Sequence, residues 1–490
     1  MLSSNQQNIM LNITKILRKK ATNKFISELG KQKNIINLTL VGSFIDKNDL
    51  DKINDIDLIV IINKLNRNNF NKIVNKVKKI KPKDLISKKN RLYVNSTFGP
   101  LKFNKNKNDL VIHLMIYDLD GHINHCIKSP FTVFDWERSK FFFRKQIKDI
   151  FSVGTLQLRD FIEGRRGVEN YLNDLINKKI SYREYKFYGK KYITVSKNIH
   201  LSDRDKFEFY FHIIKNLILN FIKFFNKKNK LYLIKKNDKQ INKYFGKKFY
   251  IKNIRNINLL LEKKKYLNYI LDRKFDKWML KFIEDYSHNL NILSKNSKKV
   301  FFFRHAKTKL NDGSFLGQSR DPSILKQNKK IKKQNFSAVY TSPLKRCKET
   351  VKILSLNNNY MSDQNLLEID YGEAEGMKFI EFAKKFPHIK KQWSQNKDPK
   401  FPKGESLKDI YLRVQKFLKK LIKNSYNKSC IITHNVFLRV LIGESFNIPK
   451  EKWHQIYIPH LMKLEFLIIN RKLYPNIERG KLKEIFSNLN

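Results

Sequence analysis

The chain has 490 residues, too many for one ordinary hydrophobic core, and at roughly 150 residues per domain it suggests about three domains. Hydrophobic residues make up 41% and aromatic residues 13% of the sequence, which excludes a wholly disordered protein. The formal net charge of +57 would suit a nucleic acid, an anionic membrane or a phosphorylated substrate as partner. Because the excess lysine occurs in every region, a compositional bias explains this charge about as well as a polyanion partner does.

The sequence predicts a soluble, cytoplasmic protein. The three cysteines, Cys126, Cys347 and Cys430, lack metal-ligand spacing and fit a reducing compartment. The N-terminal residues lack the continuous apolar core of a signal peptide. No stretch reaches the roughly 18 to 20 apolar residues needed to span a bilayer, and the closest, 207–225, is interrupted by charged and amide residues. We therefore expect no membrane partner.

Residues 1–125 alternate strand and helix patterns, which predicts an α/β domain. Runs rich in β-forming residues occur at 37–44 and 55–62, and an amphipathic helix pattern follows at 69–80. The first run ends in a Gly-Ser pair, and the second begins with Asp-Ile-Asp. Polar residues at these places make the two runs a candidate site.

Asp55 and Asp57 lie two residues apart on the second run, so their side chains point to the same face of a strand and could share divalent metal ions. Two such ions would activate a hydroxyl and neutralise a triphosphate. Gly42 permits close backbone approach to phosphate, and Ser43 can donate a hydrogen bond to it. Taken alone, Asp-Ile-Asp is more often a solvated strand face.

The Gly-Ser pair followed by an Asp-x-Asp strand resembles the polymerase-β-type nucleotidyltransferase superfamily over residues 36–118. The resemblance implies that Asp55 and Asp57 bind Mg²⁺ and that the Gly-Ser pair contacts a nucleoside triphosphate. A third acid normally arrives from a neighbouring strand. Asp109 is the best candidate for it, with His113 on the same face if that strand is regular.

The middle region, 126–297, is predicted to be mostly helical, with long lysine-rich helix patterns at 166–180 and 256–286. The Gly-Arg-Arg-Gly run at 164–167 could contact phosphates, although a capped turn between helices is the favoured interpretation. The aromatic and lysine residues of 182–195 would suit a nucleic-acid surface, but an ordinary core beneath a basic face is favoured. By analogy only, this region could hold an acceptor substrate.

After a polar linker at 294–299, two short apolar runs at 300–303 and 430–433 read as buried parallel strands. His305 follows the first run closely and His434 follows the second. Because the carboxyl ends of parallel strands meet at one edge of a sheet, the two imidazoles could meet there.

A third strand pattern, 338–342, leads into a helix. Ser342 is predicted as its N-cap and Pro343 as its first residue, which places Arg346 in the opening turn, where helix N-termini attract phosphate. Phosphoryl transfer through a side chain needs a nucleophile, cationic donors for the phosphoryl oxygens and an acid for the leaving group. Arg304, His305, Arg346 and His434 supply the first two.

These residues stand in motifs that resemble the histidine phosphatase superfamily of the phosphoglycerate mutase-like type. The motifs occur in the family's order and approximate spacing: FFFRHAKTKLN, FLGQSRDP, TSPLKRCKET, LLEIDYGEAEG, KGES and IITHN. The resemblance implies a three-layer α/β/α domain at 298–490 that needs no metal. It further implies phosphorylation of His305, protonation of the leaving oxygen by Glu368, and phosphate binding by Arg304, Asn311, Arg346 and His434. Ala306 replaces the family's usual glycine.

Other polar residues near these motifs receive ordinary interpretations. Glu373 and Glu375 are expected on a solvated turn, and Asp321 is expected to cap a turn or helix. His454 and His460 are expected to line or border the site.

The sequence as a whole predicts a multidomain α/β protein. Its expected parts are a nucleotidyltransferase-like α/β domain at 1–125, a helical middle domain at 126–297 and a histidine phosphatase domain at 298–490. The predicted function is bifunctional: hydrolysis of a small phosphomonoester, joined to a metal-dependent nucleotidyltransferase-like module. Phosphatase is preferred to phosphomutase because the long insertions of a glycolytic mutase are absent. The alternative is an RNA- or polyanion-binding protein that uses catalytic folds as a scaffold.

Overall fold

The computed structural model describes residues 4–46, 50, 53, 55–86, 91–99, 109–134, 136, 139, 141–151, 155–226, 234–263, 270–326, 335–354, 356, 359–424 and 426–489. The chain divides into two compact units, Met1–Leu290 and Asn291–Asn490. The division falls inside helix α13 (Lys274–Asn296), which continues to within two residues of the next strand. The polar segment predicted as a linker at 294–299 is therefore the end of a helix and the start of a strand.

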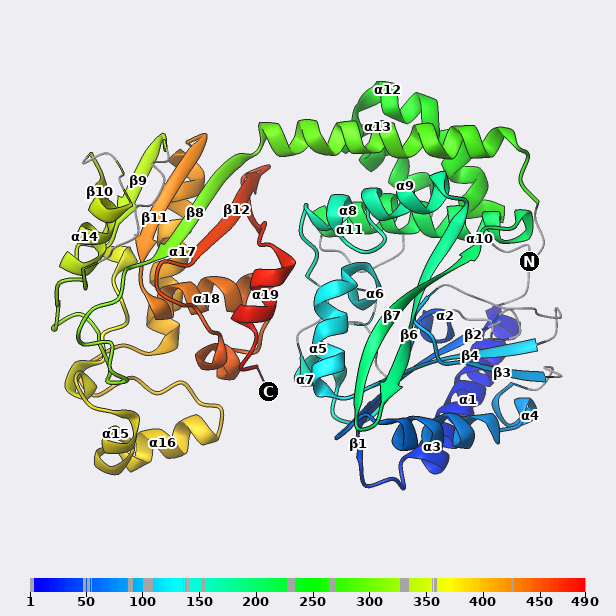
Figure 1. The fold of residues 1–490 in the computed structure, drawn as a ribbon, viewed down its shortest axis with the longest axis horizontal. Helices are drawn as coiled ribbons and strands as arrows, with labels where there is room; N and C mark the ends of the chain where they lie inside the picture. The colour runs from blue at the N-terminus through cyan, green and yellow to red at the C-terminus, as the bar shows by residue number, and fades with distance from the viewer. Residues whose placement is uncertain are drawn as a thin grey trace. The chain divides into compact units, whose positions relative to one another are not determined.

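The first unit contains a mixed five-stranded sheet in the order β3-β4-β2-β1-β5 (Figure 1). Its strands are β1 (Ile35–Val41), β2 (Asp55–Ile62), β3 (Arg91–Asn95), β4 (Asp109–Tyr117) and β5 (Phe141–Arg144). Strands β2, β3 and β4 are parallel, whereas β1 is antiparallel to both β2 and β5. The two strands predicted from the β-rich runs are thus neighbours in one sheet.

Alternate side chains of these strands pack into one core. Leu38, Leu58 and Leu114 are buried there together with Phe25 of the first helix. Because successive strand residues point to opposite faces, every second residue enters this core. The helices around the sheet are α1 (Ser4–Leu29), α2 (Ser43–Asp46), α3 (Arg67–Lys78), α4 (Pro82–Leu85), α5 (Leu119–Lys128), α6 (Pro130–Phe134) and α7 (Ile147–Ile150).

The region predicted to be mostly helical contains a long hairpin, β6 (Lys179–Tyr188) and β7 (Lys191–His200). Its turn includes Gly189, whose φ of +56° suits a tight hairpin turn. The sequence 182–195, weighed as a basic surface, is this hairpin. Its alternating aromatic residues and its central Gly-Lys were a hairpin signal that the helical interpretation missed.

The hairpin also explains why residues 1–125 are not a separate unit. Tyr185 packs against the core of the first sheet and donates a hydrogen bond to the carbonyl of Ile116 at 2.8 Å. Tyr192 hydrogen-bonds Asp118, and β5 adds a strand beside β1. Strand pairing and aromatic packing therefore join the predicted first and second domains, and the structure differs from the boundary predicted after residue 125.

The rest of the first unit is helical. Its elements are α8 (Asp160–Glu163), α9 (Val168–Ile176), α10 (Asp203–Ile214), a π-helical turn η3 (Lys215–Leu219), α11 (Asn220–Asn226), α12 (Ile234–Lys263) and the first part of α13. Helix α12 is interrupted at Gly246, where the backbone leaves helical geometry. Within the described residues, no helix is long and apolar enough to cross a membrane.

The second unit is built on a six-stranded sheet in the order β10-β9-β11-β8-β12-β13 (Figure 1). Its strands are β8 (Lys298–Arg304), β9 (Ala338–Thr341), β10 (Met361–Ser362), β11 (Lys428–Thr433), β12 (Lys463–Ile469) and β13 (Lys472–Pro475). Strands β8 to β11 are parallel, and β12 runs antiparallel to β8. This is the second α/β sheet that the sequence predicted.

Helices cover both faces of this sheet. Phe301 and Phe303 of β8 pack with Cys347 of α14, whereas Phe302, between them, contacts Phe437 of α18 on the other face. The expected three-layer α/β/α arrangement follows from this alternation. The helices of the unit are α14 (Lys345–Ile353), η4 (Gln364–Leu366), η5 (Gly372–Ala374), α15 (Phe379–Lys385), α16 (Pro387–Ser394), α17 (Leu407–Asn424), α18 (Asn435–Ser445), η6 (Lys450–Gln455) and α19 (Arg479–Ile485).

Candidate active site

Two parallel strands deliver two histidines to one edge of the second sheet. Thr433 pairs with Arg304 in register, and the next residue of each strand is a histidine. The backbone N–H of His305 donates to the carbonyl of Thr433 at 3.0 Å. The rings of His305 and His434 have centroids 5.1 Å apart, so the structure brings together the two imidazoles that the sequence placed at the strand ends.

The contacts of His305 fix the protonation state of its ring. The side chain is 2% exposed, and its Nδ1 lies 2.7 Å from the carbonyl oxygen of Ala306. Burial, reinforced by the charges of Arg346 and Arg304, holds the pKa of His305 well below its ordinary value. The neutral ring therefore donates its Nδ1 proton to the carbonyl and carries its lone pair on Nε2. The loop after His305 accommodates Ala306 in place of the family's usual glycine, and the N–H of Ala306 donates a hydrogen bond to Thr350 Oγ1 at 2.9 Å.

Two arginines flank this histidine, of which Arg346 is fully buried and Arg304 is half-buried. Arg346 is 0% exposed and donates to the carbonyls of Gly317 at 2.7 Å and Arg320 at 3.1 Å. Arg304 donates to the carbonyl of Ile458 at 2.6 Å, and burial lowers its pKa to about 10. Within the described residues, the Nε atoms of Arg304 and Arg346 are buried without a hydrogen-bond partner. Such donors suit the oxygens of a phosphoryl group.

The remaining predicted phosphate ligands lie close by or on the adjoining loop. His434 is fully buried, and its Nε2 lies 2.8 Å from Ser342 Oγ. Asn311 accepts hydrogen bonds through Oδ1 from the N–H and hydroxyl of Thr308, at 2.8 Å and 3.0 Å. These bonds fix the loop after His305 and leave the amide nitrogen of Asn311 as its donor.

The prediction that Ser342 caps the following helix is wrong. Helix α14 begins at Lys345, so Arg346 is still in its first turn, but Ser342 faces His434 instead. Asp321 takes the capping role, because its carboxylate accepts from the N–H groups of Lys345 and Arg346. It also pairs with the Arg346 guanidinium at 3.3 Å. The capping interpretation of Asp321 is thereby confirmed.

Glu368 is positioned as an acid at this site. It is 4% exposed, and its carboxylate accepts 3.0 Å hydrogen bonds from the N–H groups of Ile369, Asn435 and Val436. Burial raises its pKa, although those hydrogen bonds and the nearby Arg346 and Arg304 oppose the shift. A carboxyl group with a raised pKa keeps its proton to a higher pH than an exposed one, and it can deliver that proton to a leaving group.

Two supporting interactions were missed in the sequence. Glu375, expected on a solvated turn, accepts from the N–H groups of Gly317, Ser319 and Arg320 and shapes the loop that holds Arg346. Its neighbour Glu373 does pair at the surface with Lys403. The spacing of the family motif around Glu375 gave no sign of this contact, because the loop it binds is more than 50 residues away.

The second supporting interaction is a bidentate pair between Arg413 and Glu405, with both N···O distances at 2.7 Å. Arg413 also donates to the carbonyl of Glu368 at 3.1 Å. His460 borders the site, as the sequence predicted: its Nδ1 lies 2.9 Å from the His305 carbonyl oxygen, and its ring centroid is 5.2 Å from that of His305. Burial lowers the pKa of His460 to about 4.

The residues predicted for the N-terminal site lie around a cavity of about 220 Å³ in the first unit. Gly42, Asp55, Asp57 and His113 all line it. A Cβ on Gly42 would overlap the carboxylate of Asp57, and the φ of Gly42 is +76°, so this position requires glycine. Ser43 begins the short helix α2 beside them.

Asp109 does not join the two aspartates. In the parallel pairing of β2 with β4, Asp57 lies opposite His113, and Asp109 lies four residues earlier, where it pairs with Arg91 at 3.2 Å. His113 hydrogen-bonds Asp57 at 3.1 Å and occupies the position where a third acid was expected. Within the described residues, no group of three or more His, Cys, Asp or Glu side chains could hold a metal ion. The described part of the site thus offers the Asp55 and Asp57 carboxylates together with His113, in place of the three carboxylates that were expected.

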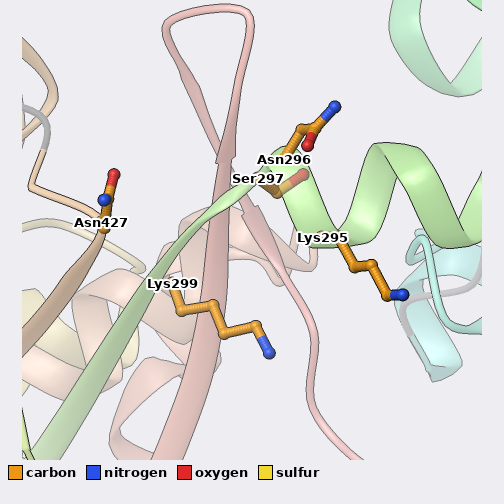
Figure 2. A pocket seen from close by; sticks show the side chains of 5 residues that line it. All are labelled: Lys295, Asn296, Ser297, Lys299 and Asn427. Atoms are coloured by element: carbon orange, nitrogen blue, oxygen red, sulfur yellow. The ribbon is translucent and has the colours of Figure 1, made fainter.

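A larger hollow of about 430 Å³ lies at the opposite end of β8 from His305. Its lining residues are Lys295, Asn296, Ser297, Lys299 and Asn427. Figure 2 shows that these side chains do not converge on one point. We assign no chemistry to this hollow.

Comparison with known proteins agrees with the geometry of the second unit. Residues 300–472 match the family model described as the histidine phosphatase superfamily (branch 1). Phosphoserine phosphatase 1 of Hydrogenobacter thermophilus is 27% identical over 155 residues, which cover 29% of this chain and 74% of that protein. The 2,3-bisphosphoglycerate-dependent phosphoglycerate mutase 2 of Gloeobacter violaceus is 26% identical, covering 27% of this chain and 64% of that protein.

Among solved structures, the phosphoserine phosphatase of Entamoeba histolytica in complex with 3-phosphoglyceric acid is 20% identical. The matched region covers 37% of this chain and 95% of the Entamoeba histolytica chain, with a TM-score of 0.33. The family match and the sequence relatives define the class: the C-terminal region is an α/β domain of the histidine phosphatase type. The protein is thus a multidomain α/β chain with a phosphatase- or phosphomutase-type domain at its C-terminal end.

Proposed function

We propose that the C-terminal domain hydrolyses a small phosphomonoester through a phosphohistidine on His305. Nε2 of His305 attacks phosphorus, the bond from phosphorus to the ester oxygen breaks, and Glu368 gives its proton to that oxygen. Water then attacks the phosphohistidine, Glu368 takes up one of its protons, and inorganic phosphate leaves. The step needs no metal, because Arg304 and Arg346 supply the positive charge around the phosphoryl oxygens.

The observation that carries this proposal is the state of His305. Its Nδ1 is bound to the Ala306 carbonyl, so the lone pair stands on Nε2 of a neutral ring beside Arg304 and Arg346. Asp321 pairs with Arg346, but within the described residues the Nε atoms of both arginines are buried without a hydrogen-bond partner. A phosphoryl group would accept hydrogen bonds from these N–H groups.

Phosphatase is proposed in preference to phosphomutase because the chain lacks the long insertions expected of a glycolytic mutase. The distinction is whether water or an acceptor hydroxyl removes the phosphoryl group from His305. Rapid conversion of 3-phosphoglycerate to its isomer without phosphate release would show a mutase instead.

The first test compares the full-length protein with His305→Ala, using phosphate release from p-nitrophenyl phosphate and phosphoserine without added metal. We expect release by the wild type and only the buffer rate for His305→Ala. His388→Ala is the matched control, because His388 is an exposed histidine of the same domain on α16. Equal rates for wild type and His305→Ala would contradict the proposal. Tight RNA binding that survives His305→Ala, with no release from either protein, would favour the scaffold alternative.

As a second proposal, the first unit transfers a nucleotidyl group, as its resemblance to nucleotidyltransferases implies. Support comes from Gly42, Asp55 and Asp57, which share one cavity, with Gly42 packed directly on Asp57. Against it stands the place of His113, where a third acid is expected. The test is pyrophosphate release from each ribonucleoside triphosphate with Mg²⁺, beside Asp57→Asn. Absence of release with every nucleotide and a panel of acceptors would refute it.

A further inference from the structure

Half of the cavity in the first unit is lined by residues that neither proposal uses. Arg165 and Arg166 come from the turn before α9, Arg183 from β6, and Lys215 and Asn216 from the π-helical turn after α10. Single π-helical turns inside α-helices are rare and are often found at functional sites. Residues from three separate elements thus bring positive charge to the cavity that also contains Asp57.

The turn at 164–167 is built to hold its two arginines in place. A Cβ on Gly164 or Gly167 would overlap backbone oxygens of the same turn, so the chain is closely folded there. Arg166 adopts a φ of +69°, which is uncommon for a residue with a side chain and carries a conformational cost. Its N–H donates to Asn170 Oδ1 at 3.0 Å. The run that the sequence favoured as a capped turn is a turn, and it also directs arginines to the cavity.

Within the described residues, one ion pair joins these three guanidinium groups to a carboxylate. Arg166 pairs with the fully buried Asp174 at 3.3 Å and donates to the carbonyl of Ser181 at 2.6 Å. Arg165 donates to the same carbonyl at 3.2 Å. Asp55 and Asp57 also line the cavity, and Asp57 hydrogen-bonds His113.

Arg183 is the least satisfied of the three. It donates to Ser129 Oγ at 2.6 Å, and its Nε is buried without a hydrogen-bond partner within the described residues. Burial lowers the pKa of Arg183, and burial with the charges of Arg166 and Arg183 lowers the pKa of Arg165 to about 9. Arg165 and Arg183 are half-buried, and partly desolvated guanidinium groups are stabilised by an anionic ligand that accepts their hydrogen bonds.

We propose that Arg165, Arg166 and Arg183 form a binding site for the phosphoryl dianion of a small phosphomonoester. The buried Nε of Arg183 offers a hydrogen-bond donor to such a group, and guanidinium groups bind phosphate oxygens through paired N–H donors. The cavity volume of about 220 Å³ is below the roughly 300 to 1,000 Å³ typical of sites for drug-sized ligands, so it suits a metabolite of a few carbon atoms. Asp57 and His113, on the same cavity, would meet hydroxyl or amino groups of that molecule. This site is separate from the one at His305 and requires neither catalytic proposal.

Isothermal titration of the full-length protein tests this site. All variants carry His305→Ala, so that phosphoserine is not consumed, and the probes are inorganic phosphate, phosphoserine and serine. We expect two binding sites for phosphoserine and inorganic phosphate and none for serine. Adding Arg183→Met, which keeps the aliphatic stem, should weaken one site by about tenfold to a hundredfold. Arg204→Met, at an exposed arginine of the same unit, should leave both sites unchanged.

A second variant and a second ligand keep the interpretation unambiguous. Arg165→Met should weaken the same site, which covers the case in which Arg183→Met fails to fold. A single site that is lost with Arg346→Met and unaffected by Arg183→Met and Arg165→Met would overturn the inference. A site in the first unit that takes ATP with Mg²⁺ but neither phosphoserine nor phosphate would also overturn it. Both outcomes are independent of phosphate release at His305.

Discussion

At the scale of single residues, the protonation states of His305 and Glu368 decide how the proposed reaction depends on pH. Burial and two arginines keep His305 neutral below its ordinary range, so the nucleophile stays available in mild acid. Burial raises the pKa of Glu368, so the acid keeps its proton to a higher pH than an exposed glutamate does. The proposed reaction needs a neutral His305 and a protonated Glu368. It should therefore proceed at pH values between the lowered pKa of His305 and the raised pKa of Glu368.

We therefore predict that activity persists below pH 6. The rate constant kcat for phosphoserine should fall as pH rises through the pKa of Glu368, and no acidic limb should occur near pH 6.5, the ordinary pKa of histidine. A pH profile of kcat and kcat/KM between about pH 4.5 and 8.5 measures this. An acidic limb centred near 6.5 would show that His305 titrates as an exposed histidine.

The role of Glu368 gives a second residue-scale prediction. Glu368→Gln keeps hydrogen-bonding atoms in place but cannot donate a carboxyl proton, so kcat for phosphoserine should fall by about 10² to 10⁴. The loss should be much smaller for p-nitrophenyl phosphate, whose leaving group departs as a stable anion. Equal losses for the two substrates would mean that Glu368 positions other groups and does not protonate the leaving oxygen.

At the scale of elements, helix α18 links the site to the core. Its first N–H groups, from Asn435 and Val436, hold Glu368, and its N-cap is His434. Near its other end, Gly443 lies against the indole of Trp453, where an added Cβ would overlap ring atoms. The indole is further held by a 2.8 Å hydrogen bond to the carbonyl of Ile448. Close packing at Gly443 thus sets where the N-terminal end of α18 lies.

We predict that Gly443→Ala destabilises the second unit by about 1 to 3 kcal/mol, because overpacking must move Trp453 or the helix. Gly480→Ala in α19 is the matched control: no atom lies within 4 Å of its added Cβ, so it should be neutral or stabilising by about 0.5 to 1 kcal/mol. Urea denaturation of the full-length variants, followed by tryptophan fluorescence, measures both. Similar effects at the two glycines would contradict this assignment.

At the scale of the whole molecule, both units bury neutral histidines. Burial lowers the pKa of His122 to about 3 and that of His460 to about 4, and it holds His125, His305 and His434 well below their ordinary range. In the unfolded chain these groups gain protons near pH 6.5, whereas in the folded chain they do not. The unfolded state therefore binds more protons below that pH, and the free energy of unfolding falls as pH falls.

We predict that both units lose thermal stability between pH 7.5 and pH 5, as measured by differential scanning calorimetry of the full-length protein. The raised pKa values of His113 and Glu368 increase the free energy of unfolding as pH falls, which opposes this trend. The histidines with lowered pKa values are more numerous, so we expect the loss of stability to prevail. The stability that His113 contributes is present below its unfolded pKa and is lost as pH rises through its folded pKa. A rise in Tm toward pH 5 would contradict the prediction.

Much of the C-terminal site was predictable because its residues stand at the ends of short apolar strands. A run such as Val300 to Phe303 can only be buried, and whatever follows it lies at the sheet edge, so His305 and His434 could be placed without tertiary information. The contacts of Glu375 with the backbone of residues 317–320 could not be predicted in this way. They join loops far apart in the chain, and no local pattern records which loop a side chain will meet.

In the N-terminal unit, too, the strands could be predicted from the sequence, whereas the contacts between distant segments could not. The sequence by itself determined its β1 and β2 strands, because strand alternation is a local property, whereas the closeness of Gly42 to the Asp55–Asp57 strand was expected from the resemblance to a known family. Only the tertiary structure decided that β4 pairs in the register that puts His113, and not Asp109, beside Asp57. It also decided that an aromatic hairpin joins two predicted domains and that three arginines meet in one cavity. Register and the packing of distant segments depend on contacts summed over the whole chain, which no local sequence pattern contains.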